Sequence, residues 1–127
     1  DWLRKQGLPF AYAYVRENGD GKGSHVHILA HLPPGAQWGY QRSRRWLEGV
    51  CECSYAQGAI KTRRIRGTIG GRVVLPNLYA KNLGVVVGYV AKGAPQEFLE
   101  AMGIIRAHEP GGRIIGKRVG WSQNIGR

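Results

Sequence analysis

The feature that most constrains the fold is a pair of alternating segments, residues 9–17 and 24–32, separated by the turn-rich segment NGDGKG. Aromatic and small side chains alternate in PFAYAYVRE, and histidines occupy odd positions of the otherwise largely apolar run SHVHILAHL. Alternation with a period of two is typical of strands, and the segment between them favours a chain reversal. The sequence therefore predicts a β-hairpin, which Pro33 and Pro34 end.

Three further elements are expected along the chain. In residues 35–52, tryptophan and polar side chains recur at helical spacing, which predicts a helix. Residues 59–66, AIKTRRIR, are β-prone and strongly basic, and they predict a third strand. Residues 94–103 predict a short helix that ends at Gly103, whereas residues 104–127 show no clear pattern.

The segment at residues 76–92 suits either a strand or a helix. Its three consecutive valines, at 85–87, favour a strand, whereas the Pro-Asn opening and the length favour a helix. We expect a helix with Gly93 at its C-terminal cap, because glycine is common there and Pro95 follows just past the end.

The length of 127 residues fits one domain, 1–127, with a core that needs neither disulfide nor metal. Strands and helices together predict an α+β fold with a central antiparallel sheet of about four to five strands and helices packed on one face. Because the first residue is Asp1 and not Met, we expect this domain to be excised from a longer protein.

The charge of the chain indicates a polyanionic partner. Nineteen Lys and Arg residues against eight Asp and Glu residues give a formal net charge of +11. A nucleic acid is the usual partner, because each neutralised phosphate releases a counterion, and the scatter of the basic residues argues against a membrane surface. The candidates for contact with the nucleic-acid backbone are Arg42, Arg44, Arg45, Lys61, Arg63, Arg64 and Arg66.

The expected compartment is the cytoplasm, without a membrane partner. No apolar run approaches the roughly 20 residues of a membrane span, and no signal-peptide pattern opens the chain. The only cysteines, Cys51 and Cys53, are too close in sequence for an easy disulfide, which fits a reducing compartment. They are either two reduced thiols or, together with two histidines, zinc ligands.

His25 and His27 lie two residues apart in a predicted strand, so their side chains project from the same face. If the hairpin pairs Glu17 with His25, the carboxylate joins that face with Cβ atoms about 5 Å apart. Two imidazoles and a carboxylate with open positions suit a divalent ion, Mg²⁺ or Mn²⁺, that also binds a substrate phosphate. His31 shares the face but lies about 13 Å further along, outside the ligand set.

Tyr89 and Lys92 are three residues apart in the expected helix and are therefore neighbours on one face. A phenol beside an ammonium group suits a nucleophile and a group that orients it or stabilises charge on a phosphate. A phenol is a weak nucleophile at neutral pH, so it needs a nearby cation and an activated phosphate.

These motifs resemble those of the HUH endonucleases, specifically the single-tyrosine replication initiators of rolling-circle plasmids, phages and small circular DNA viruses. HVH at 25–27 matches the family's His-hydrophobe-His motif, and YVAK at 89–92 matches its Tyr-x-x-Lys motif. Glu17 falls where such initiators often carry an acidic third ligand. The order and spacing agree over residues 10–93, and Val85 stands where enzymes with two catalytic tyrosines carry the other one.

The resemblance implies a ferredoxin-like or RRM-like sheet, with single-stranded DNA over the face opposite the helices, and a nicking and joining reaction. Glu17, His25 and His27 would hold the metal ion. Tyr89 would attack the scissile phosphate with help from Lys92, leaving a 5′-phosphotyrosine and a free 3′-hydroxyl. The implied substrate is DNA at a replication origin, including an origin in a hairpin, and the implied partners are a host polymerase and a helicase.

Two alternatives stay open. A transposase or a relaxase would use the same chemistry, and the sequence distinguishes these from a replication initiator only weakly. A non-catalytic nucleic-acid-binding module would instead use HVH and CEC, residues 51–53, to hold a structural zinc ion, and its positive charge would supply the affinity.

Overall fold

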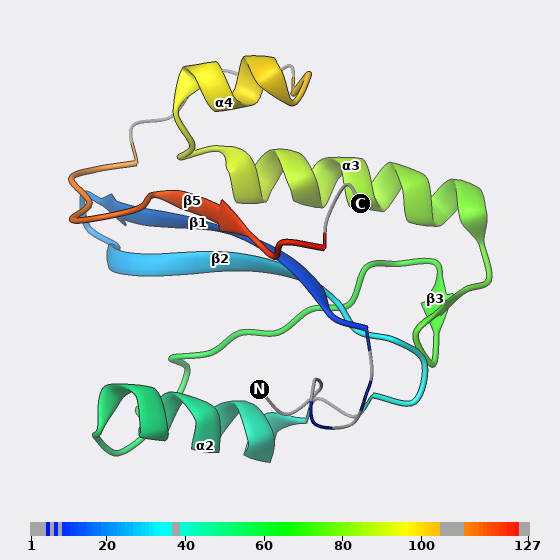
Figure 1. Cartoon of the computed structure of the whole chain (residues 1–127), viewed down its shortest axis with the longest axis horizontal. Coiled ribbons are helices and arrows are strands. Elements are labelled where there is room, and N and C mark those ends of the chain that lie inside the picture. The colour runs from blue at the N-terminus through cyan, green and yellow to red at the C-terminus, as the bar shows by residue number, and fades with distance from the viewer. Residues whose placement is uncertain (1–4, 6, 8, 37–38, 105–110, 125–127) are drawn as a thin grey trace.

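The computed structural model of the protein describes residues 5, 7, 9–36, 39–104 and 111–124. Its elements are β1 (Ala11–Gly19), β2 (Gly23–His31), α2 (Tyr40–Cys51), β3 (Thr68–Ile69), β4 (Arg72–Val73), α3 (Pro76–Ala91), α4 (Gln96–Ala101) and β5 (Val119–Trp121). An antiparallel sheet has the order β2-β1-β5, and β3 and β4 form a separate ribbon (Figure 1). The α+β class is confirmed, but this sheet has three strands where four to five were predicted.

The predicted hairpin of β1 and β2 is confirmed, and its register places Glu17 opposite His25. The turn between the strands contains Gly21, and Gly23 opens β2; their φ angles of 75° and 68° are accessible to glycine without steric cost. Because side chains alternate along a strand, this register places the Glu17 carboxylate on the same face of the sheet as His25 and His27.

The three predicted helices are present. Pro76 opens α3 in its first turn, where its missing N–H costs no hydrogen bond, and the valines at 85–87 are helical. Packing of α3 on β1 and β2 outweighs the β preference of these valines. Gly103 follows α4 with a φ of 64°, as a glycine beyond a helix end does. Among the described residues, no helix is both long and apolar enough to cross a membrane.

The strand predicted at residues 59–66 is wrong, because this segment is irregular. The Ile60 N–H donates to the hydroxyl of Tyr55 at 3.2 Å, and the Arg66 N–H donates to Oδ1 of Asn82 at 2.7 Å. A β-prone composition forms a strand only where another strand is available to pair with it. Here side chains take the main-chain hydrogen bonds near both ends of the segment instead.

The C-terminal segment, which shows no clear sequence pattern, contributes β5 to the sheet. Val119 pairs with Val15 and Gly120 with Tyr14. A Cβ at Gly120 would lie 2.6 Å from the Tyr14 ring, so the ring packs directly over the glycine main chain. β5 therefore pairs with β1, the strand that carries Glu17.

The helices lie on different sides of the sheet. α3 packs on β1 and β2, α4 lies on the same side as α3, and α2 lies on the opposite side (Figure 1). The prediction of helices on one face therefore holds for α3 and α4 but not for α2.

The hydrophobic core lies where β1 and β5 meet α4 and the C-terminal end of α3. Its buried members are Val15, Ala91, Ala94 and Leu99, with Val90, Phe98, Ile104 and Val119 packed against them. Complete burial of a leucine such as Leu99 contributes about 1.5–3 kcal/mol. The core therefore holds the end of α3, next to Lys92, against β1.

Candidate metal centre

The candidate metal ligands meet between the hairpin and the C-terminal end of α3. Glu17 faces His25 across the ladder, and His27 lies at the next position on the same face, opposite Val15. Glu17 is only 3% exposed, and both histidines are half-buried. Burying a carboxylate is costly unless cations or hydrogen-bond donors surround it, so this position needs positively charged partners.

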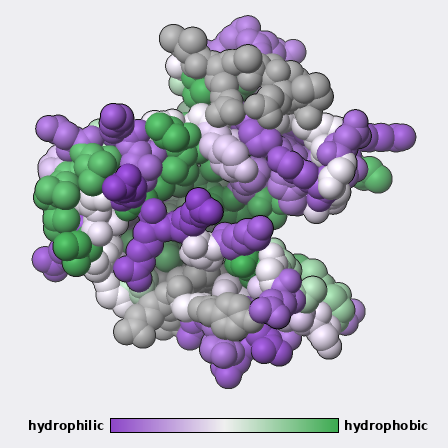
Figure 2. Space-filling model, turned by 180° about the vertical axis from the view of Figure 1, so that it is seen from behind, coloured by the Kyte–Doolittle hydropathy of each residue, from purple (hydrophilic) through white to green (hydrophobic). Residues whose placement is uncertain are grey.

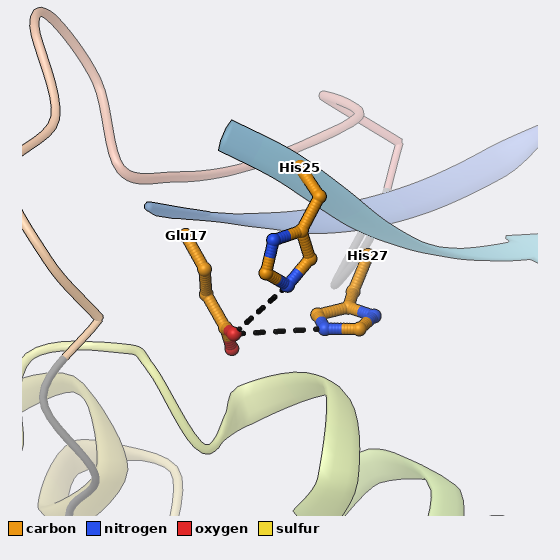
Figure 3. Close-up of side chains that lie close together, drawn as sticks. All are labelled: Glu17, His25 and His27. Atoms are coloured by element: carbon orange, nitrogen blue, oxygen red, sulfur yellow. Dashed lines mark hydrogen bonds and ion pairs between the residues drawn. The ribbon is translucent and has the colours of Figure 1, made fainter. Parts of the chain in front are cut away.

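One carboxylate oxygen, Glu17 Oε2, is the centre of the cluster. It lies 3.1 Å from Nε2 of His25, 3.7 Å from Nε2 of His27 and 3.3 Å from Nζ of Lys92. Figure 3 shows both imidazoles turned toward this carboxylate. The three ligand atoms lie within 4.8 Å of one another, and ligands at about 2.1 Å from one Mg²⁺ ion are at most about 4.2 Å apart. Small side-chain movements would let one ion contact all three.

The orientation of His25 is set by Gly23, the first residue of β2. Its Nδ1 lies 3.0 Å from the carbonyl oxygen of Gly23, and because a carbonyl only accepts, Nδ1 is the nitrogen that donates. In the neutral imidazole, Nε2 then presents a lone pair to Glu17. The lone pairs of His25 Nε2 and Glu17 Oε2, 3.1 Å apart, repel each other unless a proton or a metal ion lies between the two atoms. A carbonyl bonded to the far nitrogen is the usual way in which a metal-binding histidine is oriented.

Two buried side-chain atoms of the described residues lack a hydrogen-bond partner, and both belong to this cluster: Glu17 Oε1 and His27 Nε2. An unsatisfied buried polar atom costs about 1–3 kcal/mol. Both atoms can bind a metal ion, which would satisfy them. Two imidazole nitrogens and a carboxylate oxygen are a donor set that fits a divalent ion.

Burial lowers the pKa of His27 from its usual value of 6.5. The Glu17 carboxylate acts in the opposite direction, while electrostatic interactions with His25, Lys92 and Lys22 lower the pKa further. A lowered pKa keeps the imidazole neutral at neutral pH, and the neutral form is the one that binds metal ions.

The end of α3 brings Tyr89 and Lys92 to the cluster. The Tyr89 ring lies 5.2 Å from the His27 ring between centroids, at an interplanar angle of 73°. Lys92 Nζ lies 5.6 Å from the centroid of the Tyr89 ring. Tyr89 is 49% exposed, so a substrate can reach the phenol, whereas Lys92 is buried. The structure thus brings together the five residues to which the sequence assigned metal binding and catalysis.

Gly93 belongs to this site because it packs directly on the Glu17 carboxylate. The sequence predicts a helix-capping glycine, but Gly93 does not adopt the positive φ typical of that role. A Cβ at this position would instead lie 2.6 Å from Oε1 and Cγ of Glu17. Residue 93 must lack a side chain so that the end of α3 can contact the carboxylate.

The basic candidates lie outside the cluster, and all seven are exposed: Arg42, Arg44 and Arg45 on α2, and Lys61, Arg63, Arg64 and Arg66 in the irregular segment after it. Arg44 Nε pairs with Glu48 at 3.1 Å. Figure 2 shows hydrophilic side chains across the middle of the rear face and a hollow between the part containing α2 and the rest. The metal-ligand candidates face α3, so a DNA strand on the opposite face, as predicted, would not reach them.

Cys51 and Cys53 are exposed and free. The potential metal cluster that the described residues form consists of Glu17, His25 and His27 and includes neither cysteine. The described part of the chain therefore does not form the mixed histidine and cysteine zinc site that the sequence left open. His31 also lies outside the cluster, as expected, and is exposed at the far end of β2.

Comparison of the chain with protein-family models, curated proteins and solved structures finds no match.

Proposed function

We propose that the protein is a metal-dependent endonuclease that nicks and rejoins single-stranded DNA at a replication origin, as in rolling-circle replication. The observation that carries the proposal is the contact between the rings of His27 and Tyr89, 5.2 Å apart between centroids. It places the candidate nucleophile beside a candidate metal ligand. This proximity supports a role for both side chains at one phosphate.

In this proposal, Glu17, His25 and His27 hold a Mn²⁺ or Mg²⁺ ion, which supplies Lewis-acid polarisation of the scissile phosphate when bound. Tyr89 Oη attacks the phosphorus and the bond from phosphorus to O3′ breaks, while the phenolic proton passes to O3′. Lys92 Nζ orients the phenol and stabilises negative charge on the phosphate. The products are a 5′-phosphotyrosine and a free 3′-hydroxyl.

The covalent link makes the reaction reversible without a nucleotide cofactor. Attack by a 3′-hydroxyl on the phosphotyrosine restores a phosphodiester and returns the proton to Tyr89, so the number of phosphate ester bonds stays the same. A host polymerase would extend the 3′-hydroxyl, and a helicase would unwind the duplex. A transposase or a relaxase would use the same steps on a different DNA.

The net charge of +11 supports a nucleic-acid substrate. The seven exposed basic residues on α2 and in the segment after it lie away from the metal-ligand candidates. We propose that they bind phosphates of the strand at a distance from the cleaved one. Such contacts supply affinity that falls as the salt concentration rises, without taking part in the chemistry.

The test uses a pool of single-stranded oligonucleotides with a fluorophore at the 3′ end, incubated with the protein and Mn²⁺. A 5′-phosphotyrosine link leaves the labelled fragment attached to the protein on a denaturing gel. We expect the adduct to disappear in Tyr89→Phe and to persist in Tyr79→Phe, the matched control on the same helix. His25→Ala and His27→Ala should also remove it, whereas His31→Ala should not.

Two results would contradict the proposal. One is an adduct that survives in Tyr89→Phe or in both histidine variants. The other is DNA binding without any adduct over a range of origins and divalent ions, together with one zinc ion bound per chain. The second result would support the non-catalytic module instead.

A further inference from the structure

Beside the metal centre, Arg118 forms a group of hydrogen bonds to main-chain carbonyls. Its half-buried guanidinium donates from Nη1 to the carbonyl of Gly111 at 3.0 Å, of Arg16 at 3.2 Å and of Gly93 at 3.4 Å. Nη2 donates to the carbonyl of Gly112. These carbonyls belong to three separate segments, namely β1, the link between α3 and α4, and the stretch before β5. One side chain therefore joins three parts of the chain that are distant in sequence.

Two of these carbonyls belong to direct neighbours of site residues. Arg16 precedes Glu17 in β1, and Gly93 follows Lys92 at the end of α3. Gly93 is buried, packs on the Glu17 carboxylate and accepts a hydrogen bond from Arg118. The contact with the carboxylate and the hydrogen bond from Arg118 together fix the position of Gly93 relative to Glu17.

The glycines before β5 make room for this arrangement. A Cβ at Gly111 would clash with Nη1 of Arg118 and lie 2.7 Å from the carbonyl oxygen of Gly93. A Cβ at Gly112, where φ is 69°, would clash with the main chain of Asn18. The three main-chain segments approach one another so closely that only the guanidinium fits between them. A side chain at Gly111 or Gly112 would not fit.

Main-chain hydrogen bonds attach the same C-terminal segment to β1 on both sides of Glu17. The Arg16 N–H donates to the carbonyl of Arg118 at 2.8 Å, and the Asn18 N–H donates to the carbonyl of Gly111 at 2.7 Å. Glu17 is therefore held between two attachment points, and Arg118 is the residue that also connects them to Gly93.

We propose that Arg118 is a positioning residue of the metal centre, which holds Gly93 against the Glu17 carboxylate and so fixes the orientation of this metal ligand. Lys92, the residue before Gly93, is held beside the same carboxylate as a result. The importance of this positioning for activity rests on the proposed function. A guanidinium suits the role because its donors are fixed in a plane and can reach several carbonyls at once. A lysine ammonium keeps the charge but is a point donor that cannot span these carbonyls.

The first test measures Mn²⁺ affinity by electron paramagnetic resonance in the full chain, without DNA. The variants are Arg118→Ala and Arg118→Lys, and the control is Lys117→Ala, which removes an exposed positive charge next to Arg118. We expect affinity to fall about 10- to 100-fold in both Arg118 variants, as for groups that orient metal ligands, because Glu17 loses the contact with Gly93 that orients it. This loss outweighs the repulsion that is relieved if Lys92 moves away, and affinity should stay unchanged in the control. Millimolar guanidinium should restore much of the affinity of Arg118→Ala, because the free ion can occupy the vacated position.

Folding of each variant is checked by circular dichroism before metal is added. A folded Arg118→Ala or Arg118→Lys protein with wild-type Mn²⁺ affinity would overturn the inference. If Arg118→Ala does not fold, Arg118→Lys decides the question alone.

The second test needs no metal, so it separates this inference from the proposed function. Urea unfolding is measured for Arg118→Lys, Lys92→Met and the double variant in the presence of a chelator. If Arg118 positions Lys92 against Glu17, the double variant loses less stability than the sum of the two single losses. Additive losses would overturn the inference. Coupled losses in a protein that binds no Mn²⁺ would support it while contradicting the metal centre.

Discussion

Lys92 Nζ lies 3.3 Å from Oε2 of Glu17, the same carboxylate oxygen that faces Nε2 of both His25 and His27. An ammonium group and a metal ion would therefore share this oxygen. Two unit charges 4 Å apart interact by about 4 kcal/mol at the effective dielectric constant of a protein surface, so the two cations compete. In the metal-free protein, Lys92 neutralises a carboxylate that would otherwise be buried without a cationic partner.

Lys92→Met tests this competition. We expect it to lower the free energy of unfolding by about 1–3 kcal/mol in the presence of a chelator, because the buried carboxylate of Glu17 loses its ammonium partner. The contact of this carboxylate with the His25 imidazole remains. We expect Mn²⁺ to bind more tightly, because a repelling charge is removed, and the DNA adduct to form more slowly. Urea unfolding, calorimetry and the adduct assay measure these three quantities.

Lys81→Met is the matched control, since Lys81 is exposed on the same helix. It should change neither stability nor Mn²⁺ affinity. Weaker Mn²⁺ binding in Lys92→Met would contradict the competition and would indicate that the ammonium supports the metal site.

The lowered pKa of His27 predicts how stability depends on pH. In the unfolded chain this imidazole takes up a proton near pH 6.5, whereas in the folded protein burial delays protonation to a lower pH. Between the two pKa values the unfolded state binds more protons, so the free energy of unfolding falls as the pH decreases through this window. Above the unfolded value, His27 contributes no pH dependence.

The measurement is urea unfolding of the metal-free protein at about pH 7.5 and about pH 5, on either side of the ordinary histidine range. His27→Gln should lose less stability between these two pH values than the wild type does. His31→Gln, which changes an exposed histidine of the same strand, should lose as much stability as the wild type. A wild-type loss that is unchanged in His27→Gln would show that protonation of His27 does not cause it.

The hairpin and its cluster could be predicted from the sequence because both depend on local rules. Alternation with a period of two defines the strands, and the register of one short turn places Glu17 opposite His25. Helical spacing makes Tyr89 and Lys92 neighbours. The register and this spacing show which side chains share a face, but not that the end of α3 packs on the face of the histidines.

The other parts of the site depend on contacts that leave no periodic pattern. Arg118 binds carbonyl groups, which every residue carries, so its partners cannot be recognised from side-chain types. Gly93 is required by Glu17, a residue far away in the sequence. The strand expected at 59–66 failed for a related reason, because its β-prone composition does not show whether another strand is available to pair with it.

Gly93→Ala tests the closest contact of the site, and Gly84→Ala on α3 provides the comparison. A Cβ at Gly93 would lie 2.6 Å from Glu17 Oε1, whereas a Cβ at Gly84 has no atom within 4 Å. We therefore expect Gly84→Ala, at an exposed position of α3, to stabilise the protein by about 0.5–1 kcal/mol, since alanine has less backbone freedom to lose on folding. Gly93→Ala must push α3 away from the carboxylate, and we expect it to lose about 1–3 kcal/mol of stability and to bind Mn²⁺ more weakly. Urea unfolding and electron paramagnetic resonance measure both effects. Wild-type stability and Mn²⁺ affinity in Gly93→Ala would mean that the end of α3 can withdraw from Glu17 without cost, and that its contact with the carboxylate does not hold the metal centre together.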